Sequence, residues 1–307
     1  MTLKEAESLA ALARDADFLG PEAGAWIERL TPLRPNLVDA VAFFTERRDD
    51  VAAAELAANV WRLWLISGDI QGGRALVQAA LAAPESRPSR ERALALYADG
   101  LLAFRLGARE ESRAANAAAL EIARAAGDPE AESLALVGLS RVAFRDGDYT
   151  AVRSLALQAR KLVQGLDARA DVAPLHLLAA GTRLAGDLDA AVELYRESLE
   201  ANRRLGDRRM VAIELHNIGH VELRRGRADA ATRCFAEAET LRNPDDPYDA
   251  AMTELNGAAL AVVRGDPGSA DELLSRAQIR LAAASIVLDP DDAAEVEWLR
   301  NRLARAG

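Results

Sequence analysis

Apolar and small residues recur at helical spacing along almost the whole chain, and a glycine interrupts this pattern at a fixed interval. Successive breaks are separated by 39, 40, 39, 40 and 39 residues, at Gly68, Gly107, Gly147, Gly186, Gly226 and Gly265. A period of this size is typical of a solenoid, in which similar units stack on one another. The pattern therefore predicts one continuous array of repeats.

The residues that follow each break lie on one face of a second helix. Positions 5, 9 and 12 after Gly226 are Ala231, Phe235 and Ala238, and steps of four and three residues return to the same side of an α-helix. Small residues seven positions before a break, such as Gly219, allow two helices to approach closely. Each unit is thus predicted to be an antiparallel helix hairpin. The glycine ends the first helix, and an Asp that follows it caps the second. The expected caps are Asp69, Asp148, Asp187 and Asp266.

The two ends of the chain carry different patterns. Residues 1–53 predict N-terminal capping helices, broken at Gly20-Pro21 and from Pro32 to Pro35. Residues 54–288 predict six hairpins, and residues 289–307 predict a C-terminal capping helix with Val296, Leu299 and Leu303 on its inner side. Solenoids need such polar-backed ends to prevent end-to-end association. The predicted fold class is all-α, a right-handed superhelix of antiparallel hairpins with a period of 39–40 residues.

Charge and composition exclude several classes of function. The 38 basic and 48 acidic residues give a net charge of −10 without a long block of one sign, which disfavours direct binding to nucleic acid. No apolar run approaches the ~18 residues of a membrane span, and the N-terminal stretch has the features of neither a signal nor a transit peptide. The single cysteine, Cys234, excludes an internal disulfide framework. We therefore expect a cytoplasmic protein that binds neither nucleic acid nor a membrane.

The hairpin AIELHNIGHVELRRGRADAATRCFAEAETL, from Ala212 to Leu241, resembles the tetratricopeptide repeat (TPR) family. The departures are Glu222, where the family usually has Tyr, the missing terminal Pro, and a period longer than the usual ~34 residues. This resemblance implies a TPR-like solenoid. The residues that match the family positions are Leu215, Ile218, Gly219, Gly226, Ala231, Phe235 and Ala238.

A second resemblance begins at Ala25 and ends at Leu81. This segment is similar to the start of the C-terminal TPR region of LuxR-type and SARP (AfsR-like) bacterial transcriptional regulators, and it departs from them between Thr31 and Pro35 and at Val77. The resemblance implies a sensor or docking array that passes a signal to an ATPase. The chain contains no G-x-x-x-x-G-K-[ST] motif of its own, so it is either a free-standing relative or the tail of a longer regulator. The residues that carry the match are Trp26, Asn36, Leu37, Trp61, Trp64, Gly68, Gly73 and Arg74.

In TPR arrays the first helix of each hairpin lines a concave groove, so groove-facing positions can be counted back from each break. Arg, His, Asn and aromatic side chains on such a face suit a protein, a peptide or a small anionic ligand, through charged hydrogen bonds and stacking. The alternative is that any hairpin array must place some polar residues in contact with water. The predicted binding residues are Arg62, Tyr97, Phe104, Arg141, Phe144, His176, Arg183, His216, Asn217, His220 and Arg224.

Catalysis and metal binding have less support. His216 and His220 are spaced i, i+4 as a metal pair would be, but no H-E-x-x-H motif or third ligand is evident. Paired acids such as Asp291-Asp292 lie at helix starts, where carboxylates favour the helix dipole. We therefore expect no catalytic residue, metal or cofactor.

The predicted function is a non-enzymatic recognition module, a sensor or scaffold in transcriptional regulation or signalling. The alternatives are a free-standing peptide receptor and an enzyme that uses the groove as its active site.

Overall fold

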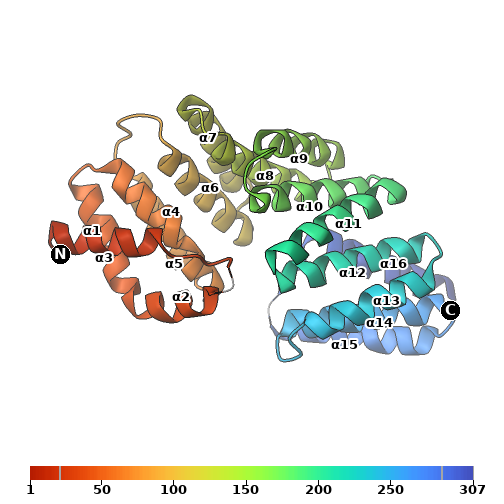
Figure 1. Ribbon diagram of the computed structural model, residues 1–307. Helices are drawn as coiled ribbons and strands as arrows, with labels where there is room; N and C mark the ends of the chain where they lie inside the picture. Colours follow the sequence, from red (N-terminus) through yellow and green to blue (C-terminus); the bar gives the residue numbers. More distant parts are fainter. Residues whose placement is uncertain (21, 285, 307) are drawn as a thin grey trace. The chain divides into compact units, whose positions relative to one another are not determined.

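The computed structural model describes residues 1–20, 22–284 and 286–306, and its regular structure over these ranges is helical (Figure 1). None of the helices that it describes is both long and apolar enough to span a membrane. The all-α class and the consecutive TPR-like hairpins predicted from the sequence are confirmed. The helices are α1 (Leu3–Arg14), α2 (Ala23–Leu30), the 3₁₀ helix η1 (Thr31–Leu33), α3 (Arg34–Glu46), α4 (Asp50–Ile66), α5 (Ile70–Leu81), α6 (Arg90–Arg105), α7 (Arg109–Ala126), α8 (Pro129–Arg145), α9 (Tyr149–Val163), α10 (Ala168–Leu184), α11 (Leu188–Leu205), α12 (Arg208–Arg224), α13 (Ala228–Leu241), α14 (Pro247–Val263), α15 (Pro267–Ala283) and α16 (Pro290–Ala306).

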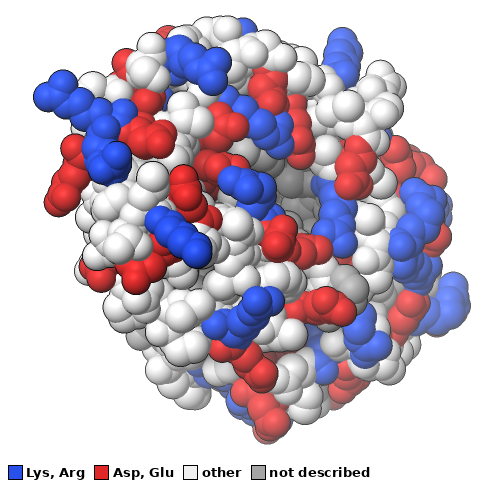
Figure 2. All heavy atoms as spheres, turned by 60° about the vertical axis from the view of Figure 1, so that its left-hand side comes forward, with Lys and Arg blue, Asp and Glu red and all other residues white. Residues whose placement is uncertain are grey.

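The helices form two compact units, each with its own core. Unit 1 comprises residues 1–143 and 154–174, and unit 2 comprises residues 144–153 and 175–307. In unit 1, Trp61 and Trp64 are buried in the core and Trp26 packs against it, as predicted. In unit 2, the apolar core is built by α12 to α16, and Phe235 and Leu299 are among its buried members. Acidic and basic side chains are interspersed over the face of the molecule drawn in Figure 2.

The glycine breaks act as helix ends. All of the break glycines have φ between 73° and 94°, the left-handed region that glycine reaches without the steric cost of a side chain. The four predicted aspartate caps are also confirmed, because each carboxylate accepts a hydrogen bond from a backbone N–H three residues later, at 2.9–3.0 Å. These two local devices place the turn between the helices of a hairpin.

The face that packs within each hairpin is the predicted one. Ala231, Phe235 and Ala238 of α13 are all buried. A side chain on Gly219 of α12 would collide with the ring of Phe235, so glycine is required where these two helices cross. The equivalent buried residues of other hairpins are Val152, Ala156, Ala159, Ala191, Tyr195, Ser198, Ala270, Leu274 and Ala277.

The departure from the TPR pattern at Glu222 is compensated by arginines. Glu222 is buried on α12, and its Oε1 lies 2.9 Å from Nη2 of Arg196 on α11. Arg225 and Arg227 approach the same carboxylate at 3.6 and 3.7 Å. A buried charge is tolerated when it is paired in this way.

The N-terminal end contains the predicted helices. The break expected from Pro32 to Pro35 is the 3₁₀ turn η1 followed directly by α3, with a proline in the first turn of each, where the missing N–H has no intrahelical partner to lose. The break expected at Gly20-Pro21 includes Pro21, which lies outside the described residues.

The C-terminal helix contacts more of unit 2 than a terminal cap would require. Val296 and Leu299 of α16 are buried, and Leu303 packs against the same core, which confirms the predicted inner side. The helix packs on α14 and α15. Its first turns also carry acidic side chains to α10 and α12, and these contacts form the candidate site.

Candidate functional site

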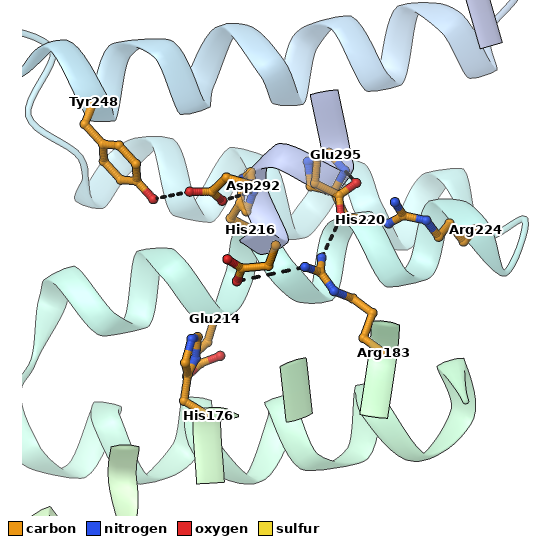
Figure 3. A network of polar contacts seen from close by, with 10 residues as sticks. His176, Arg183, Glu214, His216, His220, Arg224, Tyr248, Asp292 and Glu295 are labelled. Carbon is orange, nitrogen blue, oxygen red and sulfur yellow. Dashed lines mark hydrogen bonds and ion pairs between the residues drawn. The ribbon is translucent and has the colours of Figure 1, made fainter. Parts of the chain in front are cut away.

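Helix α16 carries three carboxylates into the interior of unit 2, from Asp291, Asp292 and Glu295; Figure 3 shows Asp292 and Glu295. All of these side chains are buried, and Glu295 is 0% exposed. An ionised carboxylate in such a place costs several kcal/mol unless cationic or hydrogen-bonding groups compensate it. The groups that do so come from α10, α12 and α14, and we call this set of contacts the carboxylate cluster.

Glu295 is the anchor of the carboxylate cluster. Its Oε1 lies 2.5 Å from Nη1 of Arg183 and 2.8 Å from Nη1 of Arg224, and its Oε2 lies 2.8 Å from Nδ1 of His220. Burial alone would raise the pKa of Glu295, but His220, Arg183 and Arg224 outweigh it and hold that pKa well below its ordinary value. Glu295 is therefore ionised at neutral pH and binds α16 to α10 and α12.

Asp291 and Asp292 are less well paired. Tyr248 of α14 donates a hydrogen bond to Oδ2 of Asp292 at 2.8 Å, and Nη2 of Arg183 lies 3.9 Å from Oδ2 of Asp291. Burial raises the pKa of both aspartates to about 6, and their mutual repulsion adds to this effect for Asp291. The N-terminal end of α16 thus carries negative charge that is only partly compensated.

The histidines lie beside these carboxylates. The rings of His216 and His220 are 4.5 Å apart, centroid to centroid, and Nε2 of His216 is 3.6 Å from Oδ1 of Asp292. Burial, reinforced by His220, lowers the pKa of His216 well below its ordinary value. His176 of α10 contacts Oε1 of Glu214 through Nδ1 at 3.0 Å. Within the described ranges, no group of three or more His, Cys, Asp or Glu side chains could hold a metal ion.

A second set of predicted residues meets in unit 1, and we call it the arginine pair site. The guanidinium of Arg62 on α4 lies 4.4 Å from the ring centroid of Trp61. Trp61 in turn makes an edge contact with Tyr97 of α6, with centroids 6.5 Å apart. Nη1 of Arg141 on α8 donates a hydrogen bond to the hydroxyl of Tyr97 at 3.1 Å. Three consecutive repeats thus bring two cations and a hydroxyl together.

The predicted residues share a register that explains these groupings. Ten residues before a break stand Tyr97, His176 and His216, and six residues before a break stand Arg62, Arg141 and His220. Positions four residues apart lie on the same side of a helix. The same helical face therefore meets carboxylates in unit 2, whereas no carboxylate that the structure describes pairs with Arg62 or Arg141 in unit 1.

Three further predicted residues are buried. Phe104, Phe144 and Asn217 are each buried, and the rings of Phe144 and Tyr149 make an edge contact with centroids 6.2 Å apart. Both amide atoms of Asn217 lie without a hydrogen-bond partner in the described structure. These three side chains lie within the helical layers.

The sequence pattern does not predict the acidic partners in the carboxylate cluster. It predicts Asp291 and Asp292 as helix-start acids, which they also are, since α16 begins at Pro290. The signal that could have identified them is the spacing of Asp291, Asp292 and Glu295, which places acidic groups on the side of α16 that also carries Leu299.

The described residues show no activated nucleophile in either set. Cys234 of α13 is the single cysteine, and burial together with the charge of Glu222 raises the pKa of its thiol. A protonated thiol is a poor nucleophile. The cationic side chains in both sets can bind anionic groups.

Comparisons with known proteins identify the repeat. Residues 171–243 match the sequence model of the tetratricopeptide repeat family. No curated protein sequence matches the chain.

Several solved structures have a similar fold. A Rap protein complexed with competence and sporulation factor is 14% identical with a TM-score of 0.62, covering 98% of this chain and 85% of that one. The Rap conjugation gene regulator of the plasmid pLS20, in complex with the Phr* peptide, is 12% identical with a TM-score of 0.54, covering 83% and 76%. BtubC from P. vanneervenii is 21% identical with a TM-score of 0.52, covering 80% and 93%. At these identities the likeness establishes the fold alone.

Proposed function

The chain is a tetratricopeptide repeat protein, and we propose that it is a non-enzymatic recognition module whose inner helical face binds an acidic segment of a protein or peptide. The observation that carries this proposal is the binding of Glu295 by Arg183, His220 and Arg224 at 2.5–2.8 Å. Arg183 and Arg224 donate charge-assisted hydrogen bonds to Oε1 of Glu295, which are the stronger kind. The chain's own α16 is thus an example of the ligand chemistry that this face accepts.

The contacts made by the hydrophobic side of α16 indicate that this face would bind an amphipathic helix more tightly than a small free acid. Leu299 is buried in the core of unit 2, and the guanidinium of Arg224 lies 5.4 Å from the ring centroid of Trp298. A segment that combines acidic residues in its first turns with apolar residues in the following turn would reproduce both kinds of contact. We therefore assign the partner to acidic amphipathic segments.

The biological role that we propose is that of a sensor or scaffold in transcriptional regulation or signalling. The resemblance of Ala25–Leu81 to the TPR regions of LuxR-type and SARP regulators supports it. The alternative role, a free-standing peptide receptor, uses the same face, and the pLS20 Rap regulator, named in complex with the Phr* peptide, has the same fold. Both roles require that the face binds a peptide in trans.

The proposed function can be tested by replacing the three carboxylates of the chain's own α16 with neutral amides and supplying the acidic segment as a separate peptide. The full chain with Asp291→Asn, Asp292→Asn and Glu295→Gln keeps every cationic group of the carboxylate cluster. A fluorescent peptide of residues 287–304 would be titrated into this variant and followed by anisotropy, alongside a matched peptide that carries Asn, Asn and Gln at the same positions. We expect the acidic peptide to bind at least about ten-fold more tightly, since it restores charge-assisted bonds worth about 1.5–3 kcal/mol each.

Two further chains complete the test. In the neutral variant that also carries Arg62→Gln and Arg141→Gln, adding Arg183→Gln should abolish the preference for the acidic peptide, and adding Arg233→Gln, an exposed arginine of α13, should not change it. Equal affinities for the two peptides, or no binding of either, would overturn the proposed function.

A further inference from the structure

We infer that the arginine pair site, formed by Arg62, Tyr97 and Arg141 of unit 1, binds a carboxylate carried by an acidic segment of a partner protein. The inference rests on the proposed function, because it assigns the ligand chemistry of the carboxylate cluster to a second place on the same helical face. It differs in one respect: the chain's own α16 fills the site in unit 2, and the acid that fills the site in unit 1 comes from another molecule.

The arginine pair site has an excess of positive charge. Other arginines of unit 1 are paired with acids: Arg74 lies 2.9 Å from Asp99, and Arg90 lies 2.6 Å from Asp128. No carboxylate among the described residues lies within ion-pair distance of Arg62 or Arg141. Burial lowers the pKa of Arg62, and the positive charge of Arg141 lowers it further. An incoming carboxylate would relieve this repulsion and replace lost hydration.

Asp17, an acid whose charge acts on Arg62, is already engaged. Its Oδ1 accepts hydrogen bonds from the backbone N–H groups of Leu19 and Gly20, both at 2.9 Å. Its Oδ2 accepts a hydrogen bond from Nη1 of Arg169 at 3.1 Å. Asp17 raises the pKa of Arg62 only as a minor electrostatic contribution, so it does not neutralise the site.

The donors of the site are held in place before a ligand arrives. Arg62 stacks on Trp61, which fixes the plane of a guanidinium that can grip a carboxylate with two parallel hydrogen bonds. The Tyr97 oxygen accepts a hydrogen bond from Arg141, and no described residue accepts the proton of its hydroxyl group. That proton can be donated to an anion. The site therefore offers donors from three helices, and no described carboxylate is paired with its two guanidinium groups.

The repeat register connects this site with the one that is already filled. Arg62 and Arg141 occupy the position that His220 occupies in its own hairpin, six residues before the break. His220 contacts Oε2 of Glu295 at 2.8 Å. Equivalent positions in stacked hairpins project from the same helical face, so this face of unit 1 is built to receive a carboxylate in the same way.

A short acidic segment fits the site better than a polyanion does. The chain carries a net charge of −10, and its long-range field opposes a nucleic-acid backbone with many phosphates. A segment with two or three carboxylates brings few charges and places them directly at the two guanidinium groups. The occupant that we assign is therefore an acidic protein segment.

The wild-type full chain tests this inference, because its α16 already fills unit 2. The probes are the fluorescent peptide of residues 287–304 and its neutral Asn, Asn, Gln counterpart. We expect the wild-type chain to bind the acidic peptide, and Arg62→Gln with Arg141→Gln to weaken that binding at least ten-fold. The matched control is Arg29→Gln, which removes an exposed arginine that lies 5.2 Å from the ring centroid of Trp26 in the same unit. This control should leave the affinity unchanged.

Each outcome separates this inference from the proposed function. If the double variant binds the acidic peptide as tightly as the wild-type chain, the inference is overturned, whereas the proposed function stands as long as Arg183→Gln abolishes binding to the neutralised chain. A wild-type chain that fails to bind the acidic peptide, or that binds inorganic phosphate in competition with it at equal charge concentration, also overturns the inference. Thermal melting of the double variant within about 3 °C of the wild type would show that a loss of binding is not a loss of fold.

Discussion

At the residue scale, the attachment of α16 depends on one side chain, Glu295. It is 0% exposed, and its oxygens lie within 2.8 Å of Arg183, His220 and Arg224. Arg183 is itself buried, so both members of the ion pair are shielded from water. Removing one member of a buried pair is costly because the other member keeps its charge without compensation.

We predict that Glu295→Gln lowers the free energy of unfolding by about 3–5 kcal/mol, because Arg183 then has no ionised partner at Glu295. Urea denaturation at neutral pH measures this loss. The control is Glu297→Gln on the exposed side of α16, for which a change within about 0.5 kcal/mol is expected. Similar effects of the two substitutions would show that the carboxylate cluster does not hold the helix.

The folding stability that Asp291 and Asp292 contribute should fall as the pH rises. Their pKa values are raised to about 6 from an ordinary value near 3.8, so the folded protein binds more protons than the unfolded chain between these pH values. Stability contributed by these groups is therefore lost as the pH rises from about 4 to above 6.

We predict that Asp291→Asn stabilises the protein by about 2 kcal/mol at pH 8, because Asn cannot acquire the partly compensated charge. The gain over the wild type should shrink steadily as the pH falls toward about 4. Urea denaturation across this range measures it, with the exposed Asp271→Asn as control. A gain that does not change with pH would mean that the charge of Asp291 is not its cause.

At the element scale, the hairpins are held by close contact between small residues and one large side chain. In the α12/α13 hairpin, Gly219 faces the ring of Phe235, and Ala231 is 0% exposed one turn earlier on α13. A packed interior of this kind has no space for a larger side chain.

We predict that Ala231→Arg destabilises the chain by more than about 2 kcal/mol, since it adds both volume and a charge at the helix crossing. Ala236→Arg on the exposed side of the same helix is the matched control. Thermal melting distinguishes them. An unchanged melting temperature for Ala231→Arg would contradict the register on which every inner-face assignment depends.

At the scale of the whole molecule, the chain is built from helix hairpins, and within each unit consecutive helices pack on one another, as α4 does on α5 and α12 on α13. Stability in such arrays is close to a sum of local contributions, so damage in one place spreads little. The exception is α16, which joins α10, α12 and α14 within unit 2 through Glu295, Asp292 and their partners.

Hydrogen exchange of backbone amides should reveal how α16 joins other helices of unit 2. We predict that Glu295→Gln speeds amide exchange in α12, α14 and α16 by about ten-fold or more, because the local opening energy falls with the lost ion pairs. Exchange in α4 and α6 of unit 1 should stay within about two-fold of the wild type. Mass spectrometry of peptides from both units measures this. A uniform increase would indicate that the chain opens as one cooperative block.

The sequence by itself determined the helical hairpins, their turns and the face that packs within each hairpin. Each of these depends on local physics. Gly226 ends a helix because it reaches positive φ, the carboxylate of Asp187 caps the next helix by accepting a hydrogen bond from the N–H of Ala190, and Phe235 returns to the buried face after nine residues. Only the tertiary structure decided which charges meet. Glu295 is 71 residues from Arg224 and 112 from Arg183, and no period relates an acid on a terminal helix to cations in earlier repeats. The packing of helices in three dimensions decides which charged side chains meet. In unit 2 it brings Glu295 of α16 to Arg183 and Arg224, whereas in unit 1 no described carboxylate pairs with Arg62 or Arg141.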